Sequence, residues 1–387
     1  MRLGGLTRQL ALATAIAVLA AACGGQTPAT SGGASSAVPA ASGASALDQA
    51  KADAAAKGMM FVTTHDEIVA KAKEEGSLRA LLSFGKEVQK PIIDSFTKAY
   101  PFIKLELQET TGSDAQRFLL ELQAGTDNAK SWDVTNISSE LYKQVIPFIA
   151  PTDVLGMSQN KVLAIDPRMV DPASRSAFAA GSATGGFAYN KKLISADKLP
   201  KTWEDFAKPE FQGKKFWTDI EPTNFASLVP LMGEQAVLDL AKKILAQQPV
   251  WVRGDTKTLT AMAAGEYQLS FASNYHSAFR AQALAPDALG IVVLDPAPVR
   301  LAQLMGTLKT AKHPYAALLL MEWFAGPDGQ KILDDTGPVQ SSVYATGSKV
   351  NQITQGKKLS VVGWAELDKL AGWQNKIVEA WGFPKAQ

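Results

Sequence analysis

Apolar and polar residues follow two alternating patterns along the chain from residue 64 onward. Short apolar runs bounded by turn residues, such as 78–84 and 132–137, are typical of buried strands. Segments in which apolar residues recur every three to four positions, such as 64–76 and 88–100, are typical of helices that cover a sheet. This order of strands and helices predicts an α/β fold whose mostly parallel sheet is covered on both faces.

Residues at the ends of these segments support the boundaries. Thr64 is a good N-cap, Gly76 stops the first helix, and Pro101 ends the second. The tail from 361 to 381 is amphipathic and is expected to wrap back over a core. The same patterns predict strands at 103–107, 185–190, 214–217 and 290–294, and helices at 115–124, 223–232, 234–246, 255–264 and 315–324.

A polar and aromatic stretch, 270–277, is the strongest candidate for a ligand site. A predicted strand precedes it, and a predicted helix, 278–284, follows it. Ligands of open α/β sheets bind at the carboxyl ends of the strands. We therefore expect this stretch to form one wall of a ligand cleft, with Asn274, Tyr275 and His276 as contacts.

Other turns at predicted strand ends and helix starts offer further contacts. Several are helix N-termini, where free N–H groups and the helix dipole favour an anion. The alternative is that their Ser, Thr and Asn residues only cap these helices. The candidate contacts in these turns are Ser83, Phe84, Gly85, Thr111, Gly112, Ser113, Asn136, Ser138 and Asn224.

Two more candidates each have two interpretations. Arg253 precedes a predicted helix, where it could clamp a carboxylate or phosphate through two parallel hydrogen bonds, or form a surface salt bridge. Tyr189 lies in the predicted strand 185–190 and could line the hinge or belong to a core. His65 and His313 are expected to be solvated.

The N-terminal residues predict export. Arg2 and Arg8 precede an apolar, alanine-rich segment that is too short to span a bilayer comfortably, so residues 1–22 are interpreted as a secretion signal. Cys23, the only cysteine, follows small residues and resembles the lipidated cysteine of bacterial lipoproteins. Residues 23–46 are then a lipidated, flexible tether. The alternative is ordinary cleavage that leaves a free thiol.

Composition excludes several classes of function. Loss of residues 1–22 removes two of the 39 basic residues and no acidic residue, so 37 residues of each sign remain. A neutral chain without a basic run argues against nucleic-acid binding. No later stretch is long and apolar enough for a membrane span. We find no P-loop, dinucleotide, nucleophile-elbow or zinc-cluster motif, so we expect no cofactor, no resident metal and no catalytic residue.

Several segments resemble, in the same order, the solute-binding proteins of ABC transporters of the ferric-iron type. The segments are 68–76, 186–193, 200–206, 313–317 and 324–330. The resemblance implies the two-lobe type 2 periplasmic binding protein fold, with mixed sheets, helices on both faces and a hinge between the lobes. It also implies a monomer in the periplasm or at the cell surface. Such a protein, attached to the membrane only by its lipid anchor, delivers a small ligand to an ABC permease in the inner membrane.

The resemblance also implies a division of the chain. Crossing strands are expected near 184–190 and 291–300, with a third crossing near Gly337. The implied parts are a leading helical segment at 47–76, a first lobe at 77–185 and 292–336, and a second lobe at 186–291 and 337–387.

The ligand class has two interpretations. The family's iron binders use adjacent tyrosines, often with a His or Glu from the first turn, because Fe(III) prefers anionic oxygen. Here Asn274 precedes Tyr275, and the first turn, 83–86, has no histidine. The sequence therefore favours a small organic anion such as a carboxylate, phosphonate or sugar phosphate. Ferric iron held by Tyr275 and His276 together with a second anion is the alternative.

Two further roles use the same fold. A secreted enzyme would use Tyr275 and His276 as acid and base. A receptor could instead present its ligand to a sensor kinase. The sequence shows no nucleophile–base motif that would favour the enzyme.

Overall fold

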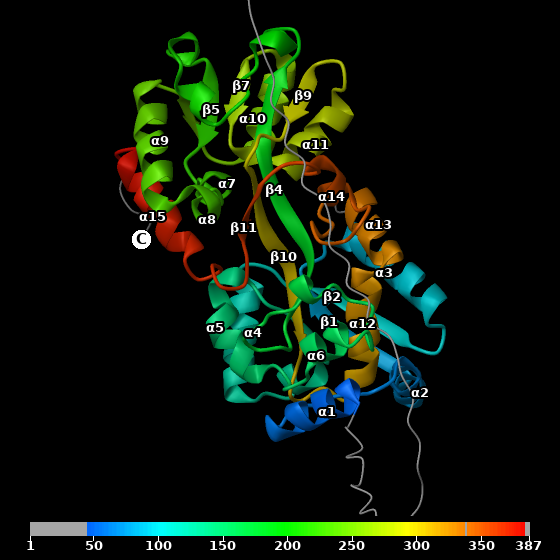
Figure 1. Cartoon of the computed structure of the whole chain (residues 1–387). Helices are drawn as coiled ribbons and strands as arrows, with labels where there is room; N and C mark the ends of the chain where they lie inside the picture. The colour runs from blue at the N-terminus through cyan, green and yellow to red at the C-terminus, as the bar shows by residue number, and fades with distance from the viewer. Residues whose placement is uncertain (1–44, 337–338, 384–387) are drawn as a thin grey trace, which may run out of the picture. The chain divides into compact units, whose positions relative to one another are not determined.

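The computed structural model describes residues 45–336 and 339–383 (Figure 1). The expected signal segment 1–22, Cys23, nearly all of the expected tether, and the crossing expected near Gly337 lie outside these residues. Helix α1 begins at Ala46, where the Ser45 hydroxyl accepts a backbone N–H as the N-cap.

The described residues form helices and strands in alternation, as the sequence predicts. The helices are α1 (Ala46–Ala56), α2 (His65–Glu75), α3 (Lys86–Ala99), α4 (Ser113–Ala124), α5 (Tyr142–Val145), α6 (Val154–Gln159), α7 (Thr223–Ala226), α8 (Val229–Met232), α9 (Glu234–Ala246), α10 (Asp255–Ala264), α11 (Tyr275–Leu284), α12 (Pro314–Ala325), α13 (Pro327–Asp335), α14 (Lys349–Ile353) and α15 (Leu370–Ala380). The strands are β1 (Ser77–Leu82), β2 (Lys104–Glu109), β3 (Val134–Asn136), β4 (Phe178–Asn190), β5 (Phe216–Asp219), β6 (Val250–Val252), β7 (Leu269–Phe271), β8 (Ser273–Asn274), β9 (Leu289–Val292), β10 (Ala297–Thr307) and β11 (Leu359–Val362).

The first lobe is built on strands β2, β1 and β3, which are parallel, and on β10, which pairs antiparallel with β3. Helix α2 starts where Thr64 Oγ1 accepts a backbone N–H and ends at Gly76, whose φ of 66° suits glycine. Helix α3 buries one face through Val88, Ile92 and Phe96. Each such side chain contributes about 1.5–3 kcal/mol through burial. These boundaries confirm the helices predicted at 64–76 and 88–100.

The second lobe contains the parallel strands β6, β5 and β7, and β4 pairs antiparallel with β7 and β9. Its core is aromatic. The ring centroid of Phe206 lies 5.0 Å from that of Phe271, and 5.4 Å from those of Phe187 and Phe216. Trp381, just after α15, is buried against the same core. The amphipathic tail therefore does cover a core, as expected.

Strands β4 and β10 belong to both lobes and lie side by side (Figure 1). Residues 178–184 of β4 pair with β10, whereas residues 185–190 pair with β7, β8 and β9. The chain comes very close to β4 here: a Cβ at Gly181 would lie 2.2 Å from the carbonyl oxygen of Gln340, and one at Gly186 would lie 2.5 Å from that of Val292. A side chain at either glycine would force the neighbouring backbone apart.

The N-terminal helices belong to the first lobe, whereas the C-terminal segment contacts both lobes. Helices α1 and α2 pack on the core of the first lobe. The segment after β11, assigned from the sequence to the second lobe, also contacts the first. Leu367 is buried in a cluster with Val145 and Leu304, and the Trp364 ring lies 6.1 Å from that of Tyr142.

Some predicted boundaries are wrong for local reasons. The helix expected at 223–232 is split into α7 and α8, because Pro230 has no N–H to donate and its ring obstructs the preceding turn. The strand expected at 265–269 begins only at Leu269, since Gly265 ends α10 with a φ of 100°. The eleven-residue strand β10 was not predicted beyond the crossing expected near 291–300.

Candidate ligand-binding site

A polar pocket of about 130 Å³ lies where several strands of the second lobe end and their following helices begin. Strand β5 supplies Asp219, the start of α10 supplies Asp255, and Asn274 caps α11. Arg300 reaches the pocket from β10. The pocket is lined by Thr218, Asp219, Glu221, Pro222, Thr223, Asn224, Phe225, Asp255, Ala272, Asn274 and Arg300.

Arg300 is the most unusual of these residues, because its guanidinium group has no hydrogen bond or ion pair with any described residue. Its Nε atom is buried and without a partner. Burial lowers the pKa of Arg300, against a smaller opposing effect of the Glu140 charge from the first lobe. A guanidinium carries five N–H donors, and donors that are shielded from water normally find acceptors. Its donors are therefore available to an anionic ligand.

Two carboxylates line the same pocket. Asp219 Oδ1 accepts the Glu221 N–H at 2.9 Å, and its Oδ2 accepts the Gly254 N–H at 3.0 Å. Asp255 Oδ2 accepts the Asn274 N–H at 2.5 Å, while its other oxygen accepts no hydrogen bond from a described residue. Burial raises the pKa of Asp255 to about 7, partly opposed by the Asn274 N–H and reinforced by the charge of Asp219. Burial likewise raises the pKa of Asp219.

The stretch 270–277, around which the site was predicted, does border this pocket, but through fewer residues than expected. Asn274 lines the pocket, and its Oδ1 also caps α11 by accepting the His276 N–H at 3.1 Å. Ala272, which the sequence analysis did not single out, adopts a left-handed φ of 51° and lines the pocket as well. Such a conformation is strained for a residue with a Cβ and is commoner at functional sites.

Tyr275 and His276 lie behind the pocket wall rather than in it. The half-buried Tyr275 ring stacks on Phe279 with centroids 6.4 Å apart, and burial raises its pKa. His276 Nδ1 is buried without a partner. Burial lowers the pKa of His276 to about 4, with Arg280 and Arg300 adding to the shift, so this imidazole is neutral at neutral pH.

Among the other predicted contacts in the second lobe, only Asn224 lines the pocket. Arg253 Nη1 donates to Glu221 Oε1 at 2.8 Å, and the Arg253 side chain is 73% exposed, which is the geometry of the surface salt bridge. The ring of Tyr189 covers Gly290, where an added Cβ would lie 2.2 Å from it. Tyr189 therefore packs at the far end of β4 and does not reach the pocket.

The predicted contacts of the first lobe lie at the carboxyl ends of β1, β2 and β3, but none of them lines the pocket around Arg300. Ser83 Oγ donates to Gln303 Oε1 at 2.8 Å, and the buried Phe84 ring stacks on Phe324. The remaining residues are Gly85 at the N-cap of α3, Thr111, Gly112 and Ser113 at the start of α4, and Asn136 and Ser138, which border a separate small cavity.

Three charged residues of the pocket were missed by the sequence analysis: Asp219, Asp255 and Arg300. Asp219 follows the predicted strand 214–217, and Asp255 begins the predicted helix 255–264, so the reasoning from strand ends and helix starts could have found both. Arg300 carried one signal, a charge inside an otherwise apolar segment.

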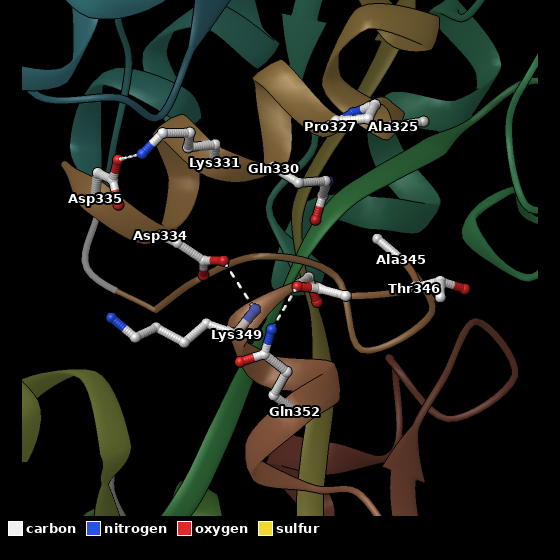
Figure 2. Close-up of a pocket in the computed structure, with 12 residues that line it drawn as sticks. Ala325, Pro327, Gln330, Lys331, Asp334, Asp335, Ala345, Thr346, Lys349 and Gln352 are labelled. Carbon is white, nitrogen blue, oxygen red and sulfur yellow. Dashed lines mark hydrogen bonds and ion pairs between the residues drawn. The ribbon is translucent and has the colours of Figure 1, made fainter.

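A larger cavity, of about 440 Å³, lies between α13 and α14 (Figure 2). Asp334 Oδ2 accepts the Lys349 N–H at 2.8 Å, and Lys331 forms an ion pair with Asp335. No residue predicted to contact the ligand lines this cavity.

The expectation that the histidines are solvated is wrong for His313, whose side chain is only 21% exposed, whereas the His65 side chain is 41% exposed. His313 Nδ1 lies 2.8 Å from Asp133 Oδ2, and its Nε2 lies 3.0 Å from Ser77 Oγ. His65 Nε2 lies 2.7 Å from Glu322 Oε2. His65 thereby connects α2 to α12, and His313 connects the start of α12 to Asp133 and to Ser77 in β1.

Two searches of the described residues bear on function. Residues 45–336 and 339–383 contain no group of three or more His, Cys, Asp or Glu placed to share a metal ion. In the same residues, no helix has the length and apolar character needed to cross a membrane.

Two α/β lobes that share strands, with a polar pocket at the strand ends, define a two-lobe periplasmic solute-binding protein. A model of the bacterial extracellular solute-binding protein family matches residues 91–355, and the chain belongs to that family. The expected fold and the expected relation to type 2 binding proteins of the ferric-binding kind are confirmed.

The similar proteins include several described as iron-binding. The "Fe(3+)-binding periplasmic protein" of Serratia marcescens is 26% identical over 172 residues, which are 42% of this chain and 49% of that protein. The chain thus matches about half the length of this curated relative.

Solved structures share the fold. A Trichodesmium protein in complex with iron and citrate ligands has a TM-score of 0.61 and 20% identity, covering 80% of this chain and 100% of that one. A putative extracellular solute-binding protein from Bordetella parapertussis has a TM-score of 0.63 and 14% identity, covering 79% and 98%. The chain is therefore an extracellular solute-binding protein.

Proposed function

We propose that the chain captures a small organic anion in the pocket around Arg300 and delivers it to an ABC permease. The observation that supports this most directly is the Arg300 guanidinium, which lines the pocket without a hydrogen-bond or ion-pair partner among the described residues. An unpaired charge that is partly shielded from water carries a cost in free energy. A carboxylate, phosphonate or phosphate that forms two parallel hydrogen bonds with Arg300 would offset that cost.

Ferric iron is the second candidate, and the named relatives favour it. The curated relative is described as Fe(3+)-binding, and the Trichodesmium structure holds iron together with citrate. The side chains of this chain favour it less, because Tyr275 stacks on Phe279 and no group of three His, Cys, Asp or Glu among the described residues is placed to share a metal. A ferric complex of an organic anion would still use Arg300, through the anion.

The attachment and assembly of the protein complete the proposal. Cys23 would carry the lipid that holds the mature protein at the membrane, and residues 23–44 would tether the described fold to it. The protein would act as a monomer in the periplasm or at the cell surface.

Thermal unfolding of the chain from residue 23 onward, with Cys23→Ser, tests the ligand class. The probes are citrate, ferric citrate, simple carboxylates, a phosphonate and sugar phosphates. A ligand at a hundred times its Kd adds about 2.7 kcal/mol to the stability of the folded state. We expect a metal-free anion to raise Tm, Arg300→Met to abolish the shift, and the control Arg117→Met, on the exposed face of α4, to retain it.

The same experiment separates the two candidates. A shift with ferric citrate but with no metal-free anion, accompanied by a visible phenolate absorption band that Tyr275→Phe removes, would establish iron as the ligand. A shift with a metal-free anion that persists in Arg300→Met would show that the anion binds elsewhere.

A further inference from the structure

The pocket around Arg300 contains acids as well as a base. Glu221 already pairs with Arg253, whereas Asp219 and Asp255 make no ion pair with any described cation. An anion bound at Arg300 would therefore lie in a pocket that also holds two carboxylates. Repulsion between like charges disfavours such a complex unless the ligand brings a positive charge of its own.

The free acceptor sites of the two acids suit an ammonium group. Asp255 has one carboxylate oxygen with no hydrogen bond from a described residue. Each oxygen of Asp219 accepts one backbone N–H and keeps a further lone pair. A protonated amine has three N–H donors and no acceptor, so it can donate to both carboxylates at once.

We infer that the pocket selects a short zwitterion, whose acid group pairs with Arg300 and whose protonated amine donates to Asp255 and Asp219. This inference rests on the proposed function, since it adds an amine to the organic anion proposed there. Burial raises the pKa of Asp255 to about 7, and a protonated amine beside this carboxylate would lower that pKa.

The pocket's size and lining agree with this ligand. Its volume of about 130 Å³ is below that of pockets for drug-sized ligands and suits a small solute. Of its lining, only Pro222, Phe225 and Ala272 are apolar. A metal ion fits the two acids less well, because no third His, Cys, Asp or Glu among the described residues is placed to complete a metal site.

Calorimetric titration with matched probes tests the inference on the same Cys23→Ser chain. Each pair differs in the amine: β-alanine against propionate, and O-phosphoethanolamine against ethyl phosphate. We expect the probe with the amine to bind at least about tenfold more tightly in one or both pairs. Asp255→Asn keeps the side-chain shape and an acceptor for the Asn274 N–H but removes the charge. In Asp255→Asn, the ratio of the two affinities within each probe pair should therefore be close to one.

The controls separate failure of this inference from failure of the proposed function. Asp239→Asn, on the exposed face of α9, should leave the ratio unchanged. If propionate or ethyl phosphate binds as tightly as its amine-bearing partner, and Arg300→Met abolishes both, the zwitterion is refuted and the anion site stands. If neither member of either pair binds, or Arg300→Met has no effect on binding, the zwitterion inference and the proposed anion site are both refuted for carboxylates and phosphates of this size.

Discussion

The Nδ1 atom of His313 lies 2.8 Å from Oδ2 of Asp133, although the two residues are 180 positions apart in the chain. The buried carboxylate of Asp133 also accepts backbone N–H groups from Arg79, Lys312 and His313. It thereby joins β1 to the loop that begins α12. The arrangement Ser77–His313–Asp133 has hydrogen-bond distances like those of a hydrolytic triad, but it lies at the amino end of β1, away from the pocket around Arg300.

Replacing Asp133 should therefore destabilise the fold without affecting ligand binding at the pocket. Asp133→Ala leaves three backbone N–H groups and the His313 ring without their acceptor, and we expect a loss of about 3–5 kcal/mol in the free energy of unfolding. Urea denaturation measures this loss. Asp94→Ala, which removes an exposed ion pair on α3, is the control and should cost less than about 1 kcal/mol. A loss as small as the control's would mean that this network does not stabilise the fold.

The aromatic core of the second lobe should be sensitive to truncation. Phe206 is fully buried and contacts the rings of Phe187, Phe216 and Phe271. Phe206→Ala removes these contacts and leaves a cavity, so we expect a loss of about 3–5 kcal/mol. Leu284→Ala is the matched control, because Leu284 is 89% exposed and its truncation should change stability by no more than about 0.5 kcal/mol. Equal effects of the two variants in urea denaturation would contradict the described core.

The ligand-free protein should lose stability as pH rises through the titration of Asp255. Its folded-state pKa is about 7, above the unfolded value of about 4, so the folded state binds more protons between these pH values. Stability therefore falls as pH rises from about 4 to 7, by about 2–4 kcal/mol from this group. Asp255→Asn should remove that fall and be the more stable protein at pH 8. Urea denaturation at pH 5 and pH 8 checks it, and parallel pH dependence in both proteins would refute it.

Titration of His276 should have the opposite effect on stability, which is lost as pH falls. Its folded-state pKa of about 4 is below the ordinary 6.5, so the unfolded state binds more protons between these values. The stability it contributes is present above pH 6.5 and is lost as pH falls to 4, by about 2–3 kcal/mol. His276→Phe keeps a ring in the buried site and should remove this loss, which urea denaturation at pH 4.5 and pH 7 measures. An undiminished acid loss in the variant would assign it to other groups.

Helices whose ends are set by local chemistry were predicted well. The Thr64 cap and the Gly76 stop are visible in the sequence and define α2, and the predictions for 234–246 and 255–264 match α9 and α10. Strand β10 was not predicted at full length, because its hydrogen bonds go to β3, β4 and β11, and no local pattern shows such distant partners.

The site was predicted only in part, for the same reason. The rule that ligands bind at strand ends led to Asn224 and Asn274, which do line the pocket. It also led to Phe84, which packs in a core, because the rule does not say which way a side chain points. Arg300 was not predicted as a site residue, because its pocket forms only when β10 pairs with β4 in the folded protein.

The two strands shared by the lobes, β4 and β10, determine how the protein unfolds. Unfolding either lobe would remove the hydrogen-bond partners of one part of β4, residues 178–184 or 185–190, in a strand that continues without a break into the other lobe. Neither half can then melt while the other stays intact, so heat should produce one sharp transition with equal calorimetric and van't Hoff enthalpies. For the same reason, a fragment ending at residue 184 would present β4 as an unpaired, aggregation-prone edge rather than as a working half of the receptor.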